Sequence, residues 1–233
     1  MKVLLVIPVV NVEKTILQVV EQIQKANPKV DYLVVDHGST DRTIDLLDNN
    51  KMTYLSTPLP TSYSQAFKIG LRYAQAQEYQ AVVEFDGSNF FEVSDIQKLT
   101  KQAQKNDFVL ATRFTDAKRS KKRRWSDKIL TWALKRSTRR YISDPVLRFR
   151  LFKLKTLETL IRDDTWSGPD AIALLLMNQY LFTEVGVNLK INPLKRKYSG
   201  LYPTRWRRWM QVLRWLISIL VVQRLKRGPS NHE

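Results

Sequence analysis

The chain of 233 residues contains no cysteine. It therefore has neither a disulfide framework nor a thiolate metal site, which is consistent with a reducing compartment. Any bound metal ion would need oxygen or nitrogen ligands instead.

Long apolar runs are missing as well. The chain has no uninterrupted stretch of about 18 apolar residues, so we expect no membrane-spanning helix. The N-terminal MKVLLVIPVV is like a signal peptide only superficially, because its apolar run is short and no small-residue cleavage site follows it. We interpret it as a strand. The hydrophobic content of 43% is sufficient for one large domain with a buried core.

Acidic residues are scarce in the second half of the chain. Residues 1–110 carry 11 Lys and Arg against 13 Asp and Glu, whereas residues 111–233 carry 28 against 9. The formal net charge of +17 thus comes from the second half. Such a surface must face something anionic, and the candidates are nucleic acid, acidic lipid headgroups and phosphorylated substrates.

Short β-rich apolar runs alternate with helical patterns through the first 140 residues. The β-rich runs cover residues 2–7, 31–36, 52–55, 81–85 and 108–112, and the helical patterns cover 13–26, 44–47, 64–76, 95–104 and 125–138. This alternation predicts an α/β fold with a mostly parallel sheet flanked by helices on both faces. We expect residues 1–203 to form this domain and residues 204–233 to form a C-terminal amphipathic helical extension.

Three acidic residues stand where predicted strands end. Asp36 ends the run DYLVVD, and Glu84 and Asp86 end VVEFD with one residue between them. Ligands of parallel α/β sheets bind outside the carboxyl ends of the strands, so these side chains would converge on one crevice. Carboxylates held together indicate a divalent cation or proton transfer. For any one of them, a cap of the following helix is the commoner role.

Five stretches follow one another in a fixed order across nearly the whole chain. They are VIPVVNVEKTI at 6–16, VVDHGSTDRT at 34–43, EFD at 84–86, DFVLATRF at 107–114 and ISDPVLRFRLF at 142–152. Together they resemble the motifs of family 2 glycosyltransferases with the GT-A fold, and more closely those of the dolichol-phosphate mannosyltransferase-like branch. Five matches in the right order and spacing are hard to explain by chance.

The resemblance implies a Rossmann-like GT-A fold that binds a nucleotide-diphosphate sugar. It also implies Mg²⁺ or Mn²⁺ between the acidic motif and the diphosphate, where the ion offsets the charge that develops as the sugar departs. On the matching positions, the implied metal ligands are Glu84, Asp86 and Ser88. The implied nucleotide-sugar-binding residues are Pro8, Val10, Asp36, His37, Glu84 and Asp86.

Two further motif residues are similar to positions that serve the acceptor. Asp144 matches the Asp of the I-S-D motif and is either a general base or the partner of an arginine; with Asp86 it is a candidate catalytic residue. Arg150 matches the Arg of the G-F-R motif, and its guanidinium suits bidentate binding of a phosphate. The run KRSKKRR at 118–124 has six basic residues in seven and is either a solvated loop or part of the same site. The candidate acceptor-phosphate ligands are Arg113, Lys121, Arg123 and Arg150.

Several positions depart from the family pattern. His37 replaces the second Asp of a D-D pair, Val10 and Val12 replace Tyr and Glu of the opening motif, and Leu147 and Arg148 replace a Ser-Gly pair. The D-x-D motif also begins with Glu. These departures support a second hypothesis, in which a GT-A protein with weakened or no catalysis acts as a scaffold for envelope-biosynthesis enzymes.

The C-terminal stretch TRWRRWMQVLRWLISILVVQRLKRG at 204–228 combines tryptophans and basic residues around a short apolar core. It is too short to span a bilayer but suits a helix that lies in the headgroup region of an anionic membrane. The alternative is a helix packed on the domain.

The sequence thus predicts an inverting glycosyltransferase that is cytoplasmic, peripherally membrane-associated and active in cell wall biogenesis. The N-terminal half would hold the nucleotide sugar, and the basic half would hold a polyprenyl phosphate or an envelope glycan acceptor. An acceptor phosphate would need little general-base help, whereas a hydroxyl would need Asp86 or Asp144. Nucleic-acid binding is the least favoured interpretation, because no recognisable nucleic-acid-binding motif accompanies the basic stretches.

Overall fold

The structure is a computed structural model that describes residues 1–26, 30–87, 89–114, 125–162, 168–190 and 205–226. Within these ranges no helix combines the length and the apolar character needed to cross a bilayer.

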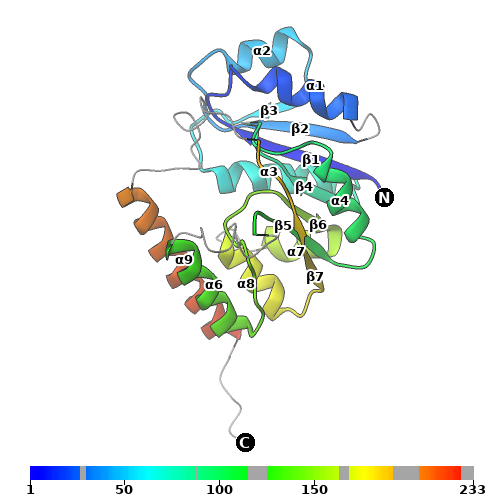
Figure 1. Ribbon diagram of the computed structural model, residues 1–233. Helices are drawn as coiled ribbons and strands as arrows, with labels where there is room; N and C mark the ends of the chain where they lie inside the picture. The colour runs from blue at the N-terminus through cyan, green and yellow to red at the C-terminus, as the bar shows by residue number, and fades with distance from the viewer. Residues whose placement is uncertain (27–29, 88, 115–124, 163–167, 191–204, 227–233) are drawn as a thin grey trace, which may run out of the picture.

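A sheet forms the centre of the fold (Figure 1). Among the described residues it has seven strands: β1 (Val3–Val9), β2 (Asp31–Asp36), β3 (Tyr54–Ser56), β4 (Ala81–Glu84), β5 (Phe108–Thr112), β6 (Arg150–Lys153) and β7 (Phe182–Gly186). Their spatial order is β3-β2-β1-β4-β6-β5-β7. Neighbouring strands are parallel except that β6 runs antiparallel to both β4 and β5. The prediction of a mostly parallel α/β sheet is confirmed.

Helices cover both faces of this sheet (Figure 1). One face carries α1 (Ile16–Ala26), α2 (Thr43–Asn49) and α4 (Asp95–Gln102). The other face carries α3 (Tyr63–Ala76), α6 (Trp125–Thr138), α7 (Leu154–Arg162), α8 (Pro169–Met177) and α9 (Arg205–Lys226).

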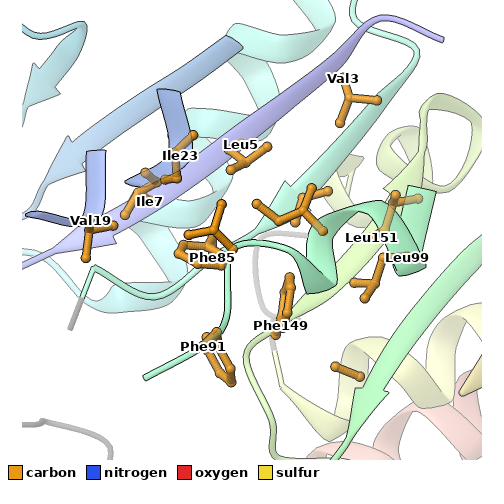
Figure 2. Close-up of a cluster of buried hydrophobic side chains, with 14 of the residues drawn as sticks. Val3, Leu5, Ile7, Val19, Ile23, Phe85, Phe91, Leu99, Phe149 and Leu151 are labelled. Atoms are coloured by element: carbon orange, nitrogen blue, oxygen red, sulfur yellow. The ribbon is translucent and has the colours of Figure 1, made fainter. Parts of the chain in front are cut away.

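The alternation of side chains along each strand divides the core into two clusters. Leu5 and Ile7 of β1 belong to the cluster under α1, whereas Leu4 and Val6 belong to the cluster under α3. Figure 2 shows the first cluster, in which rings from three segments meet with centroids 4.9 to 5.9 Å apart: Phe85, Phe91 and Phe149. Because both faces are covered, the central strands are apolar on both sides.

Helix α3 lies directly on β1 and begins at the edge of the sheet where the parallel strands end. A Cβ at Gly70 would lie 2.2 Å from Val6 Cγ1, so the close approach requires glycine. Ser62 caps the helix reciprocally: Gln65 N donates to Ser62 Oγ at 3.2 Å, and Ser62 N donates to Gln65 Oε1 at 3.0 Å. The cap fixes the first turn of α3, which starts with Tyr63.

Helix α9 packs one of its faces on α6 and α8 (Figure 1). Val212 and Ile219 lie seven residues apart on this face and are buried. Trp215 lies against the start of α8, where a Cβ at Gly168 would be only 2.4 Å from the indole Nε1. The helix thus shares a core with the preceding helices, and the division of the chain at residue 204 stays a prediction.

Candidate active site

The ends of the parallel strands and the start of β6 lie at one edge of the sheet, here called the carboxyl edge. Asp36 ends β2, Glu84 ends β4, and Arg150 begins β6 beside it. Asp36 and Glu84 are separated by β1, which places their strands about 10 Å apart. The structure therefore brings the acidic strand ends to one edge, as the sequence predicts.

Asp36 is buried and its carboxylate organises the turn that follows β2. The backbone N–H groups of Gly38 and Ser39 donate to Oδ2 at 3.2 Å, and the Ser39 hydroxyl donates to Oδ1. The Ser56 hydroxyl on β3 donates to the same carboxylate at 3.4 Å. Asp36 thus fixes the shape of the loop after β2.

Asn11 joins the loop after β1 to the loop after β2, and it is a residue that the sequence reasoning missed. Its backbone is in the left-handed region with φ of 54°. Its Oδ1 accepts from Thr40 N at 2.8 Å and from Asp41 N at 3.3 Å, and its own N–H donates to Ser39 Oγ at 2.8 Å. An Asn two residues after the end of a strand is the signal that could have identified it, because Asn tolerates this conformation.

Three other residues expected at the nucleotide lie around the same loops. Pro8 lies in β1 and is buried. It comes after Val6, the last residue of β1 that pairs with β4, so its missing N–H removes no hydrogen bond from the β1–β4 ladder. Val10 is exposed. His37 is nearly buried, and its Nδ1 lies 3.0 Å from the Thr61 carbonyl oxygen. Nδ1 must therefore donate, which leaves Nε2 as an acceptor in the neutral ring.

Glu84 and Arg150 form a buried ion pair across the antiparallel β4–β6 ladder, where they stand opposite each other. Arg150 Nε donates to Glu84 Oε2 at 2.6 Å, and Arg150 is only 3% exposed. The guanidinium also reaches the Gly168 carbonyl at 3.4 Å. This differs from the expectation that Arg150 binds an acceptor phosphate, because its guanidinium is buried inside the fold and serves Glu84.

The second oxygen of Glu84 and the carboxylate of Asp86 fit a divalent ion that takes most of its ligands from substrate phosphates. Glu84 Oε1 is buried and has no hydrogen-bond partner in the part of the chain that the structure describes. Asp86 follows two residues later and is 8% exposed. The described residues contain no cluster of three or more His, Asp or Glu side chains suited to a metal. Mg²⁺ is usually held by one or two carboxylates together with substrate phosphates, and this pair of oxygens meets that requirement.

Asp144 forms a second acid–arginine pair at the carboxyl edge. Arg113, directly after β5, donates to it from Nε to Oδ2 and from the NH2 group to Oδ1, both at 2.7 Å. The Arg113 backbone N–H adds a bond of 3.1 Å, and Asp144 is buried. Of the two roles expected for Asp144, the structure shows the partner of an arginine.

Glu184 on β7 supports this pair and is a second residue that the sequence reasoning missed. Its carboxylate accepts from Ser143 N at 2.9 Å, from Ser143 Oγ at 2.8 Å and from Asp144 N at 3.4 Å. Burial raises the pKa of Glu184, and the Ser143 hydrogen bonds offset part of that rise. No local pattern marks Glu184, because its partners lie about 40 residues away in the sequence.

Tyr63 and Arg148 complete the edge near Glu84. The Arg148 guanidinium carbon lies 3.8 Å from the centroid of the Tyr63 ring, a cation–π contact. The Tyr63 hydroxyl is buried without a hydrogen-bond partner among the described residues. Burial raises the pKa of Tyr63 well above its usual value, and the charges of Glu84 and Asp86 add to the rise. The sequence marked Arg148 only as a departure from the family motif.

Three of the predicted site residues lie outside the described residues. They are Ser88, Lys121 and Arg123.

The chain matches the model of glycosyl transferase family 2 over residues 4–164. It belongs to this family. No curated protein sequence matches the chain. The prediction of a family 2 glycosyltransferase, an enzyme that uses a nucleotide sugar, is thus confirmed, whereas the branch within the family is not decided by this match.

Solved structures support the GT-A fold. Glucosyl-3-phosphoglycerate synthase of Mycobacterium tuberculosis superposes with a TM-score of 0.69 at 14% identity, covering 95% of this chain and 80% of that one. Its complex with Mn²⁺ and UDP-glucose gives 0.64 at 16% identity, covering 94% and 78%. Its complex with Mn²⁺, UDP-glucose and phosphoglyceric acid gives 0.62 at 15% identity, covering 94% and 79%. At these identities the similarity shows the fold.

Proposed function

We propose that this glycosyltransferase transfers a sugar from a nucleotide-diphosphate sugar to a phosphate-bearing acceptor at an anionic membrane surface on the cytoplasmic side. Polyprenyl phosphate, the acceptor class of the dolichol-phosphate mannosyltransferase-like branch, is the leading candidate, with a role in cell wall biogenesis. The observation that carries the membrane part is the exposed apolar face of α9.

The donor would bind at the carboxyl edge. The loops after β1 and β2, tied together by Asn11 and shaped by Asp36, would hold the nucleoside beside His37. Asp86 and Glu84 Oε1 would hold Mg²⁺ or Mn²⁺, which offsets the charge that develops on the departing diphosphate. Mn²⁺ accompanies UDP-glucose in the similar mycobacterial enzyme.

A phosphate acceptor agrees with the pairing of Asp144. Because Arg113 holds both carboxylate oxygens of Asp144, this carboxylate is poorly placed to take a proton from an acceptor hydroxyl. A phosphate oxygen is already ionised near neutral pH and needs no such base. The proposal retains Arg113, Lys121 and Arg123 as acceptor-phosphate ligands and leaves out the buried Arg150. The similar mycobacterial enzyme was solved with phosphoglyceric acid, which also carries a phosphate.

The membrane contact would be made by the outer face of α9, defined by Met210, Leu213, Ile217 and Leu220. The spacing of three, four and three residues places these side chains on one side of the helix, and each is at least 50% exposed. Trp209 on α9 and Trp132 on the adjacent α6 are exposed too. Helix α9 contains no acidic residue. An exposed apolar face on a basic helix suits binding in the interface of an anionic bilayer.

A transferase assay tests the reaction. UDP- and GDP-sugars are combined with a short-chain polyprenyl phosphate, with 3-phosphoglycerate, or with neither, and transfer is followed by mass spectrometry. Product on the polyprenyl phosphate supports the proposal. Product on 3-phosphoglycerate alone would replace the lipid acceptor by a small phosphorylated acid.

A liposome assay tests the membrane contact. The triple variant Leu213→Ser, Ile217→Ser, Leu220→Ser should co-sediment at least about 10-fold less with vesicles containing phosphatidylglycerol. Burial of one such side chain contributes roughly 1.5 to 3 kcal/mol at full depth, and about 1.4 kcal/mol is already a factor of ten. The control replaces three exposed leucines from other parts of the chain by serine: Leu55, Leu59 and Leu181. Equal sedimentation of both triple variants and the wild type would refute the contact.

The scaffold hypothesis retains one supporting observation. Two carboxylates of the family motifs, Glu84 and Asp144, each bind an arginine of this chain. Nucleotide binding without turnover for any donor and acceptor in the transferase assay would favour a scaffold with weakened or absent catalysis.

A further inference from the structure

Asp86 and Arg148 follow the last residue pair of the β4–β6 ladder. Pairs run from Ala81 and Lys153 to Glu84 and Arg150, so two residues further along each chain stand Asp86 and Arg148. The rings of Phe85 and Phe149, the next residue along each chain, contact each other edge to face with centroids 5.3 Å apart. The charges of Asp86 and Arg148, like those of Glu84 and Arg150, all act on the pKa of the buried Tyr63 hydroxyl, so the four side chains gather around Tyr63.

Arg148 differs from the two other arginines of the carboxyl edge. Arg113 and Arg150 each bind a buried carboxylate. Arg148 is half-buried on the Tyr63 ring, and within the described ranges the structure gives it no hydrogen bond or ion pair. A half-buried guanidinium without an acidic partner is unfavourable unless an anion from outside the chain supplies the missing interactions.

The charges around this position balance without a metal ion. Arg150 neutralises Glu84, and Arg148 adds a positive charge in the neighbourhood of Asp86 without binding it. A pair of carboxylates without such cations would repel a diphosphate until a divalent ion bound. Here the edge between β4 and β6 is close to neutral, and Arg148 adds a half-buried guanidinium, which suits bidentate binding of phosphate oxygens.

We propose that Arg148, supported by the Tyr63 ring, binds the diphosphate of the nucleotide donor and allows the nucleotide to bind even when no divalent ion is present. This inference rests on the proposed use of a nucleotide-diphosphate donor. Arg148, which departs from the family motif, would thus supply a fixed positive charge at the donor.

Calorimetric titration of the full chain with UDP and with GDP, in EDTA and in Mn²⁺, tests the inference. In EDTA the wild type should bind one of the two nucleotides with an affinity within about 10-fold of that in Mn²⁺. Arg148→Gln should weaken binding in EDTA by about 10- to 100-fold, the range expected for a charged hydrogen bond, and less in Mn²⁺. The loss should be much smaller for the corresponding nucleoside monophosphate.

Two matched variants complete the design. Arg136→Gln removes an exposed arginine from α6 and should leave the affinity for UDP or GDP unchanged. Arg148→Lys keeps the charge but loses the planar fork and should bind with intermediate affinity. Because Arg148 is only half-buried and precedes β6, we expect the melting temperature of Arg148→Gln to match that of the wild type.

The outcomes separate the inference from the proposed function. Wild-type binding in EDTA that Arg148→Gln weakens supports the inference. Binding that strictly requires Mn²⁺, or that Arg148→Gln leaves unchanged, overturns it while the proposed donor class stands. A wild type that binds neither nucleotide under either condition overturns both.

Discussion

The carboxyl edge of the sheet and the outer face of α9 depart from the usual arrangement of side chains in opposite directions. At the carboxyl edge, charged side chains are buried, and Glu84 and Asp144 are each matched by an arginine. On the outer face of α9, large apolar side chains are exposed, and no described residue covers them. The first departure is compensated within the chain, whereas the second is the basis of the membrane contact proposed above.

The largest effect should follow from breaking the Glu84–Arg150 pair. Arg150→Met leaves the Glu84 carboxylate buried without its partner, and we expect a loss of about 3 to 5 kcal/mol in the free energy of unfolding. Urea denaturation measures this loss.

The double variant Glu84→Gln, Arg150→Met is the control, because it removes both charges and should recover most of the stability. A loss below about 1 kcal/mol in the single variant would mean that water or ions replace Arg150, and that the edge is not internally compensated.

The two faces of α9 can be compared directly with neighbouring isoleucines. Ile219 is 1% exposed and Ile217 is 54% exposed. Ile219→Ala should cost about 2 to 5 kcal/mol, because it leaves a cavity in the core shared with α6 and α8. Ile217→Ala should change stability by less than about 0.5 kcal/mol. Thermal and urea unfolding of both variants measures the difference, and equal losses would contradict the orientation of α9 on α6 and α8.

Asp144→Asn distinguishes a structural carboxylate from a catalytic one. The variant loses the charge-assisted bonds to Arg113, so we expect about 1 to 3 kcal/mol less stability. A general base would instead cost roughly 10²- to 10⁴-fold in kcat. Measuring unfolding and turnover on the same preparation decides between them. A large loss of kcat at unchanged stability would return Asp144 to the role of general base.

The smallest effect concerns the pH dependence of stability at Glu184. Burial raises the pKa of this carboxyl above its ordinary value of 4.5. The folded protein then binds the proton more tightly than the unfolded chain, so this contribution to stability is lost as pH rises from the ordinary to the raised pKa. Glu184→Gln removes the titration. The free energy of unfolding of the variant, relative to that of the wild type, should therefore rise across this pH range. Urea unfolding of both proteins at pH 4 and pH 7 measures it. The same difference in free energy at both pH values would argue against a raised pKa of Glu184.

The sequence by itself determined the elements whose signals are local. The apolar runs and helical spacings correctly predicted β1, β2, β4, β5, α3 and α6, because the central strands are continuous apolar runs and the helices bury residues at helical spacing. The same alternation predicted that Asp36 and Glu84 lie at one edge of the sheet. The family motifs then supported the GT-A fold and the glycosyltransferase family.

Only the tertiary structure decided what these side chains bind. Strand β6 begins with a buried arginine and is inserted antiparallel between β4 and β5, so no local pattern marks it. Glu84 and Arg150 are 66 residues apart in the sequence, and Tyr63 and Arg148 meet from α3 and the segment before β6. Likewise, the period of α9 defines its two faces, but only packing against α6 and α8 selects the buried one. Side-chain partners depend on long-range pairing, and periodicity along one segment carries no information about the segment that will lie beside it.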